Sequence, residues 1–92
     1  MSRIDTQFFE HIQNIPVIDL HGFRADEVRE QLNFELNKLV VNKCEFCRIV
    51  HGVGEGVLSS IIEEELSENP LIEAFFLDSH GGSTTVRLYP HW

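Results

Sequence analysis

The sequence is poor in positive charge and lacks any long apolar run. Seven lysines and arginines stand against fifteen aspartates and glutamates, so the net charge is −8. This balance argues against a protein that coats nucleic acid non-specifically, because neutralised phosphates supply most of that affinity, but it leaves a local cationic site open. Apolar runs such as residues 74–77 are far too short to span a bilayer, and the first residues contain no signal-peptide core. We therefore expect a cytosolic protein without membrane contact.

Cysteine is also scarce. Cys44 and Cys47 form a C-x-x-C pair, but the second pair that a zinc ribbon needs is missing. A thioredoxin-like pair would open a helix, whereas this pair enters an apolar, strand-like run. We predict that Cys47 lies in the core and Cys44 in the preceding loop, with no metal bound by either.

No linker, repeat or low-complexity tract divides the 92 residues, so we expect one domain. Residues 5–13 carry apolar side chains at helical spacing, which makes residues 1–15 an N-terminal helical extension to a main domain at 16–92. In the main domain the patterns predict strands at 16–20, 46–50, 72–77 and 84–89. Helices are predicted at 25–41 and from the glycines at 54–56 to the Asn-Pro at 69–70.

This order, (α)βαβαββ, indicates an α/β fold. Right-handed crossovers would place both helices on the same face of a sheet. The last two strands can pair as a hairpin through Gly81 and Gly82. We predict a two-layer sandwich in which a mostly parallel four-stranded sheet carries helices on one face and leaves the other face open.

Two histidine-glycine pairs, His21-Gly22 and His51-Gly52, each follow a predicted strand. Ligands of parallel α/β sheets bind at these carboxyl ends of the strands. Asp19 precedes His21 by two residues and so points to the same side of its strand. A carboxylate beside a histidine holds its tautomer, as general acid–base chemistry requires. We predict Asp19, His21 and His51 as catalytic; alternatively, Asp19 anchors a loop and His21 is a hydrogen-bonded edge residue.

Glycine-rich segments follow the predicted strands at 46–50 and 72–77. Residues 52–56 lead into a helix start, where free N–H groups and the positive helix end bind anions, although the pattern is neither a P-loop nor a Rossmann fingerprint. A phosphodiester backbone is the simplest anion to propose, with surface ion pairs as the alternative role of the arginines. The predicted nucleic-acid-binding residues are Gly22, Arg24, Arg48, Gly52, Gly54, Gly56, Gly82, Ser83, Thr84 and Arg87.

These motifs resemble those of the small MutS-related (Smr) domain. Its L-D-L-H-G motif is similar to residues 18–22, its H-G-x-G loop to 51–54, and its glycine-rich turn before a T-x-V-x-L strand to 82–88. The resemblance covers about residues 17–89. It implies a fold like the C-terminal domain of bacterial translation initiation factor three, and binding or cleavage of DNA or RNA. The resemblance also implies that Asp19 and His21 are catalytic. It implies that the loop from His51 to Gly54 binds the substrate or takes part in catalysis.

The leading hypothesis is a nucleic-acid-binding domain with endonuclease activity that nicks DNA or cleaves RNA. A divalent metal such as Mg²⁺ stays open as a cofactor, because no ligand spacing here is diagnostic. The rival is a non-catalytic module that binds RNA or the ribosome, and a third hypothesis is a protein-interaction domain using the open sheet face. Convergence of Asp19, His21, His51 and His80 would favour catalysis, whereas His51 in the core would favour binding.

Overall fold

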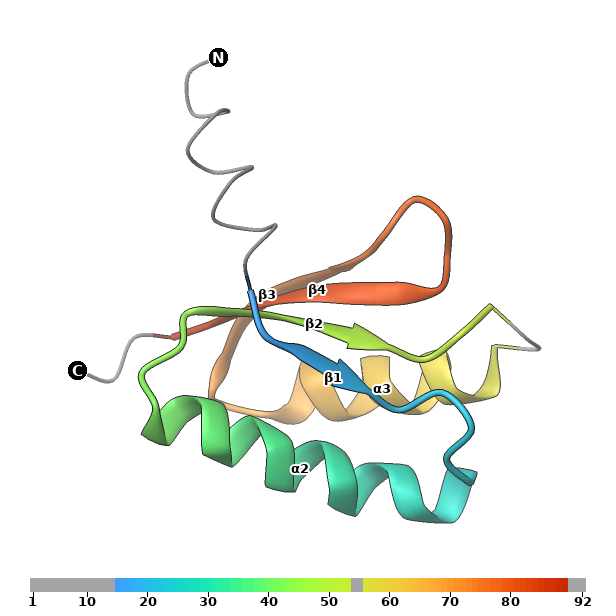
Figure 1. The fold of residues 1–92 in the computed structure, drawn as a ribbon, viewed down its shortest axis with the longest axis horizontal. Helices are drawn as coiled ribbons and strands as arrows, with labels where there is room; N and C mark the ends of the chain where they lie inside the picture. Colours follow the sequence, from blue (N-terminus) through green and yellow to red (C-terminus); the bar gives the residue numbers. More distant parts are fainter. Residues whose placement is uncertain (1–14, 54–55, 90–92) are drawn as a thin grey trace.

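The computed structural model describes residues 15–53 and 56–89, which form a layer of sheet and a layer of helices (Figure 1). In chain order the elements are β1 (Val17–Asp19), α2 (Ala25–Val41), β2 (Phe46–Val50), α3 (Val57–Glu68), β3 (Ile72–Leu77) and β4 (Ser83–Leu88). The bounds predicted for α2, β2 and β3 are confirmed, and β4 begins and ends one residue earlier than predicted. The helix predicted at 5–13 lies outside the described residues.

The sheet has the strand order β1-β2-β4-β3, so the predicted mostly parallel sheet is wrong. Only β1 and β2 pair in parallel; β4 lies between β2 and β3 and is antiparallel to both. The last strand, β4, is one of the two inner strands, and five of its six residues are buried. Since β2 and β3 are both antiparallel to β4, they run in the same direction as β1. The carboxyl ends of β1, β2 and β3 therefore still meet at one edge.

Helix α2 begins and ends where its sequence predicts. Glu27 accepts a 3.1 Å hydrogen bond from the Arg24 N–H, and Asp26 adds a second carboxylate to the first turn. Lys38 lies in the last turn, so the charges at both ends complement the helix dipole. No helix within residues 15–53 and 56–89 is long and apolar enough to cross a membrane.

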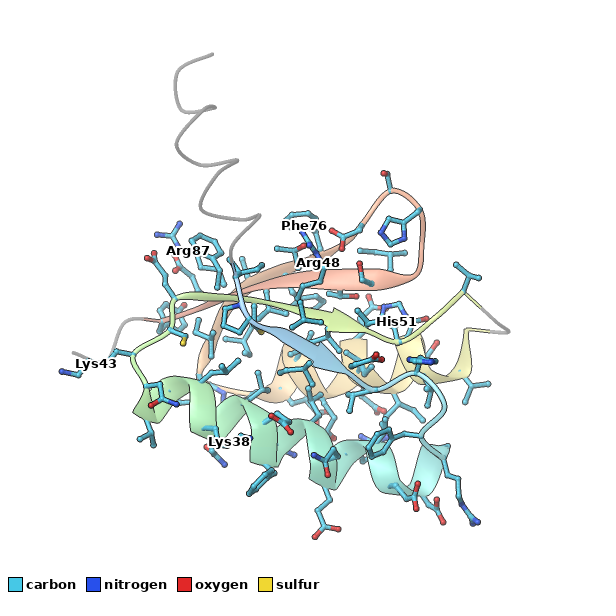
Figure 2. The ribbon with its side chains drawn as sticks, viewed as in Figure 1. Lys38, Lys43, Arg48, His51, Phe76 and Arg87 are labelled. Atoms are coloured by element: carbon cyan, nitrogen blue, oxygen red, sulfur yellow. The ribbon has the colours of Figure 1, made fainter. Side chains whose placement is uncertain are left out.

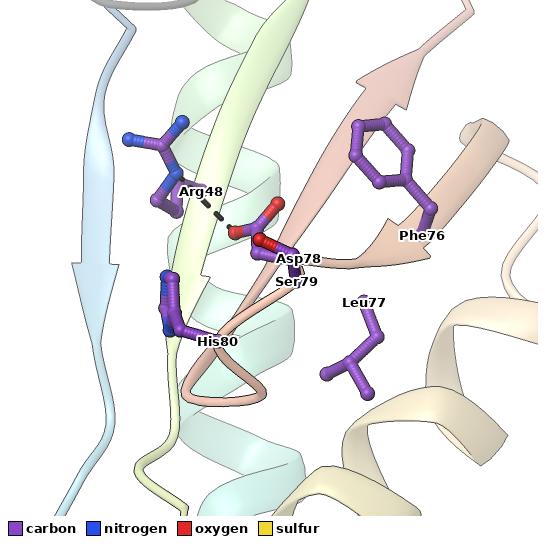
Figure 3. A pocket seen from close by; sticks show the side chains of 6 residues that line it. All are labelled: Arg48, Phe76, Leu77, Asp78, Ser79 and His80. Atoms are coloured by element: carbon purple, nitrogen blue, oxygen red, sulfur yellow. Dashed lines mark ion pairs between the residues drawn. The ribbon is translucent and has the colours of Figure 1, made fainter.

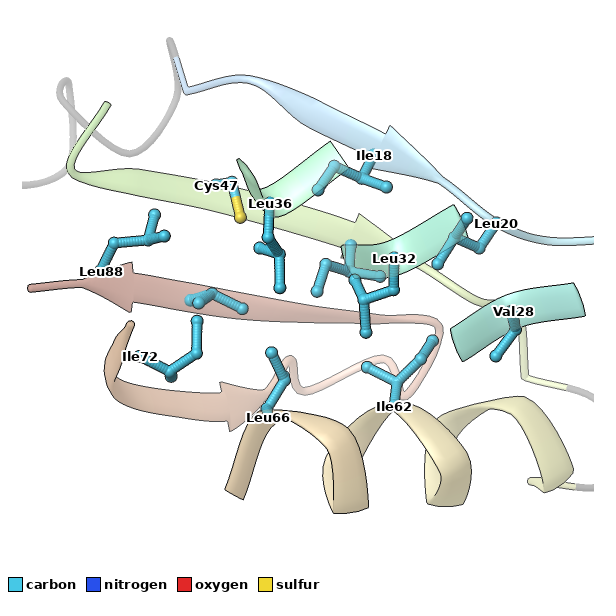
Figure 4. Close-up of a cluster of buried hydrophobic side chains, with 12 residues drawn as sticks. Ile18, Leu20, Val28, Leu32, Leu36, Cys47, Ile62, Leu66, Ile72 and Leu88 are labelled. Atoms are coloured by element: carbon cyan, nitrogen blue, oxygen red, sulfur yellow. The ribbon is translucent and has the colours of Figure 1, made fainter. Parts of the chain in front are cut away.

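A cluster of buried side chains fills the space between the sheet and the helices (Figure 4). Its most deeply buried members are Leu20, Val28, Leu32, Leu36, Cys47, Ile49, Ile62, Leu66, Val86 and Leu88. Each fully buried leucine or isoleucine stabilises the fold by about 1.5–3 kcal/mol. Because strand residues alternate between faces, Asp19, Arg48 and Arg87 lie on the face away from the helices. The predicted positions of Cys47 in the core and Cys44 before β2 are also confirmed.

Candidate functional site

The histidine-glycine pair after β1, the pair after β2 and the turn before β4 meet at one edge of the sheet. The N–H groups of His51 and Gly52 both donate to the Gly82 carbonyl, at 3.1 and 2.9 Å. The Gly52 backbone lies against His21, since a Cβ at position 52 would stand 3.9 Å from His21 Cβ. The segments predicted to form one site are therefore neighbours in space.

Asp19 and His21 form a hydrogen-bonded pair on the open side of this edge. Asp19 Oδ1 accepts from His21 Nδ1 at 2.5 Å and from the His21 backbone N–H at 3.2 Å. These bonds, above all the one from the imidazole, hold the pKa of Asp19 below its ordinary value of 3.8. An ionised carboxylate only accepts hydrogen bonds, so neutral His21 carries its proton on Nδ1 and keeps the lone pair on Nε2. With side chains 55% and 67% exposed, Asp19 and His21 are open to a ligand.

His51 points the other way, into the protein, and is only 5% exposed. Its Nε2 lies 3.0 Å from Thr84 Oγ1, and its Nδ1 lies 3.1 Å from the Gly52 carbonyl oxygen. Because that carbonyl can only accept, Nδ1 carries the proton and the Thr84 hydroxyl donates to Nε2. Protein groups thus occupy both ring nitrogens. The structure brings Asp19 and His21 together but leaves His51 out of that pair, and its burial argues against catalysis by His51.

Asp78, the first residue after β3, organises the turn before β4. Its Oδ1 accepts a 2.8 Å hydrogen bond from Thr85 Oγ1, and its Oδ2 accepts a hydrogen bond from Ser83 Oγ. Arg48 Nε lies 3.5 Å from the same Oδ2. Ser83 is itself buried, so its hydroxyl holds the turn in place and does not face solvent.

His80 lies in the same turn, and its tautomer follows from its contacts. The Gly82 N–H donates to His80 Nδ1 at 3.0 Å, so Nδ1 acts as the acceptor. Neutral His80 therefore carries its proton on Nε2, which lies 3.4 Å from Ser83 Oγ. His80 belongs to the Asp78 turn and makes no hydrogen bond with His21 or His51.

The predicted glycines occupy distinct places. Gly22 and Gly52 each have φ +86°, a left-handed conformation that lets the chain turn directly after each histidine. Gly56 is the N-cap residue of α3. Gly82 presents its carbonyl to the second histidine-glycine pair, as described above, and Gly54 lies outside the described residues.

Arg87 lies at the other end of the sheet. It is opposite Phe46, the first residue of β2, whereas the site edge follows the last residue of that strand. Four residues of strand correspond to roughly 13 Å. Figure 2 shows Arg87 and His51 toward opposite ends of the sheet. Glu45 and Glu73 neutralise Arg87, with N···O distances of 2.8 and 3.3 Å, so the alternative of a surface ion pair fits it better.

The other two predicted arginines are also paired with carboxylates. Arg24 contacts Asp26 at 3.2 Å on the first turn of α2. Arg48 contacts Asp78 through Nε only, near the middle of the open face. Of the predicted arginines, Arg48 is the one that the sheet places between the Asp19–His21 pair and the Asp78 turn.

No group of three or more His, Cys, Asp or Glu side chains suited to a metal ion occurs in the described part of the chain. Asp19 and His21 would supply two ligands. A divalent ion at this edge would need further oxygen ligands from a substrate or from water.

Sequence reasoning missed two residues here, Asp78 and Phe76. A register shift between Ile72 and Ala74 marks a β-bulge in β3. Without it, alternation from the buried Ile72 would turn Phe76 toward the core. The bulge instead places Phe76 opposite Thr85 on the open face, where it is 55% exposed. The run Ala-Phe-Phe-Leu at 74–77 contains no signal for this bulge.

The fold and this edge define a class of domain: a two-layer α/β sandwich with an Asp-x-His pair after its first strand, a buried His-Gly loop after its second, and a glycine turn before its last. The profile of the Smr domain matches residues 18–88, and the chain belongs to this family.

Solved structures agree with this assignment. The Smr domain of Thermus thermophilus MutS2 superposes with a TM-score of 0.78 at 28% identity, covering 83% of this chain and 100% of that one. YdaL, a stand-alone small MutS-related protein from Escherichia coli, superposes with a TM-score of 0.71 over 78% of this chain and 63% of YdaL. At 18% identity, the YdaL comparison bears on the fold alone.

Curated relatives include the ribosome rescue factor SmrB of Shewanella sp. strain W3-18-1, which is 30% identical over 59 residues. The SmrB of Shewanella baltica strain OS155 is 32% identical over the same length. Each alignment covers 64% of this chain and 34% of the relative, so the chain spans about a third of the length of these proteins.

Proposed function

We propose that this Smr domain binds RNA, with ribosome-associated RNA as the substrate class, and cleaves its phosphodiester backbone. The observation that carries the proposal is the exposed Asp19–His21 pair at the carboxyl edge of the sheet. Membership of the Smr family supports a nucleic-acid ligand. The relatives named ribosome rescue factors support RNA over DNA.

In the proposed reaction, His21 acts as the general base. Its Nε2 takes the proton of a ribose 2′-hydroxyl, and the 2′-oxygen attacks the adjacent phosphorus. The bond from phosphorus to the 5′-oxygen breaks, which gives a 2′,3′-cyclic phosphate and a 5′-oxygen that takes a proton from water. Asp19 retains the Nδ1–H bond and stabilises the imidazolium that forms. A positioned base of this kind contributes about 10²- to 10⁴-fold in rate.

The negative charge that develops on the phosphate during cleavage must be stabilised by hydrogen-bond donors. These donors must not already be used within the fold. The N–H groups of His51 and Gly52 donate to the Gly82 carbonyl and so cannot serve this purpose without a rearrangement. The Gly22 and Val53 N–H groups have no partner within residues 15–53 and 56–89. Since Gly22 follows His21 directly, we assign its N–H as the first donor to the phosphate.

The proposal is tested with purified protein on a structured RNA and on supercoiled plasmid DNA. We expect RNA cleavage that falls by about 100-fold or more in Asp19→Ala and in His21→Ala. Glu30→Gln is the matched control, because Glu30 is an exposed carboxylate on α2, away from this edge. Cleavage that survives both Asp19→Ala and His21→Ala would exclude this mechanism, and nicking of plasmid alone would exclude RNA as the substrate.

A second candidate function is binding to RNA or the ribosome without cleavage, and the burial of His51 favours it. Under this alternative, the chain would co-sediment with ribosomes, with affinity falling steeply as salt rises, and no RNA would be cut. Retained binding by Asp19→Asn and His21→Gln would support it, because neither substitution removes a positive charge that meets phosphate.

A further inference from the structure

An open hollow of about 640 Å³ lies on the sheet face opposite the helices (Figure 3). It lies within the size range of small-ligand sites, about 300–1,000 Å³. Its walls come from β2, β3 and the turn before β4: Arg48, Phe76, Leu77, Asp78, Ser79 and His80. No step of the proposed cleavage uses the hollow.

Phe76 gives the hollow a flat apolar wall. The β-bulge in β3 turns its ring to the open face, and Figure 2 shows Phe76 and Arg48 on the side of the sheet away from the helices. A phenylalanine that is 55% exposed leaves much of its ring in water. Stacking against another flat ring would remove this surface from water.

Arg48 and Asp78 give the hollow a polar wall with both donors and acceptors. Arg48 uses only its Nε toward Asp78, so both of its Nη groups are without a partner in the described residues. Asp78 is held by the hydroxyls of Ser83 and Thr85, which fixes its carboxylate and, through it, the guanidinium. A ligand with a flat ring, hydrogen-bonding edges and a nearby negative charge would use every one of these groups.

The register connects this hollow to the Asp19–His21 pair. Phe76 is opposite Thr85, Thr85 is opposite Arg48, and Arg48 is opposite Val17, so the four form one row across the sheet. Asp19 follows on the same strand and face as Val17. Three strand spacings amount to about 14 Å. A chain seated at Phe76 would thus reach the Asp19–His21 pair after passing Arg48.

We infer that the hollow binds one unpaired nucleobase of a single-stranded nucleic acid, stacked on Phe76, with the adjacent phosphate at Arg48. The inference rests on the proposed function and deepens it, because it selects a single strand over a duplex. A base inside a duplex has both faces stacked on its neighbours and cannot also stack on Phe76, whereas an unpaired base can be splayed out onto an aromatic side chain.

The test measures binding of the full chain to an end-labelled single-stranded RNA, a DNA of the same sequence, and the corresponding RNA duplex, by fluorescence anisotropy at low salt. Phe76→Leu keeps an apolar side chain but removes the ring, and Phe76→Trp keeps a ring. Phe34→Leu is the matched control, since Phe34 is 57% exposed on α2. A 2-aminopurine in the RNA reports stacking through quenching of its fluorescence.

We expect single strands to bind more tightly than the duplex, and Phe76→Leu to weaken single-strand binding at least about fivefold while Phe76→Trp and Phe34→Leu do not. The quenching should disappear in Phe76→Leu. Equal losses in Phe76→Leu and Phe34→Leu, or unchanged single-strand binding in Phe76→Leu, would overturn this inference and leave the proposed function standing. A wild-type chain that binds none of the probes would overturn the proposed function itself.

Discussion

Thr84 Oγ1 donates a hydrogen bond to His51 Nε2 across 3.0 Å in the interior of the domain, and this bond connects the loop after β2 to β4. Both residues are almost fully buried, at 6% and 5% exposure. The histidine of the H-G-x-G loop therefore serves the fold at this edge, while the Asp19–His21 pair faces solvent. The two histidine-glycine pairs look alike in sequence, but their histidines lie in different environments, one buried and one exposed.

Thr84→Val should destabilise the domain. Valine matches threonine in shape but leaves His51 Nε2 buried without its donor, which costs about 1–3 kcal/mol of unfolding free energy. Thr84→Ser keeps the hydroxyl and should cost less. Urea unfolding followed by circular dichroism measures both, and a Thr84→Val variant as stable as wild type would show that the bond contributes nothing.

The directions of the strands could be predicted from sequence, but their order could not. Apolar periodicity and glycine turns place β2, α2 and β3 at their observed bounds. They do not determine whether β4 pairs with β3 alone or inserts between β2 and β3. That choice depends on how much of each strand is buried in the fold, and β4, with five of its six residues buried, takes one of the two inner positions. The meeting of the two histidine-glycine pairs at one edge of the sheet could be predicted, because it depends only on strand direction.

Within the site, alternation correctly orients Asp19 and His21, because β1 has no irregularity. It fails for Phe76, because one bulged residue in β3 exchanges the faces of everything after it. It also does not reveal the partners of the arginines. The carboxylates of Glu45, Glu73 and Asp78 come from other strands and from a turn, so only the fold brings them together.

Asp19 should make folding stability depend on acidity in a defined window. Its pKa in the folded domain lies below the ordinary 3.8, so ionised Asp19 stabilises the fold at any pH above that value. This contribution falls as the pH drops below 3.8 and is lost once the pH passes the lower, folded-state pKa. We expect wild type to have a higher urea midpoint than Asp19→Asn at neutral pH, with the gap closing in this acidic window. A gap that widens on acidification would contradict the assignment.

The two cysteines should react at very different rates. Cys47 is completely buried, and this burial raises the pKa of its thiol to about 12, so it holds almost no thiolate at mildly alkaline pH. Cys44 is half-buried in the loop before β2. Iodoacetamide should alkylate Cys44 first, as read by mass spectrometry of peptides, and Cys47 only when urea unfolds the domain. Cys44→Ser should abolish the early reaction; equal rates at both positions would contradict the packing described.

Arg48 and Arg87 provide a matched pair for testing where nucleic acid binds. Both lie on the open face and both are ion-paired, but Arg48 is beside the Phe76 hollow and Arg87 is at the far end of the sheet. Arg48→Gln should weaken binding of single-stranded RNA and reduce the slope of log affinity against log salt by about one, the loss of one phosphate contact.

Arg87→Gln should leave both the affinity and the salt slope unchanged, because Glu45 and Glu73 already neutralise that guanidinium. Anisotropy titrations at several salt concentrations measure both variants, and urea unfolding checks that each remains folded. An equal loss of affinity in the two variants would mean that RNA lies along the whole open face, beyond the edge that carries Asp19 and His21. A loss confined to Arg87→Gln would place the interface at the opposite end of the sheet and separate it from the proposed catalytic pair.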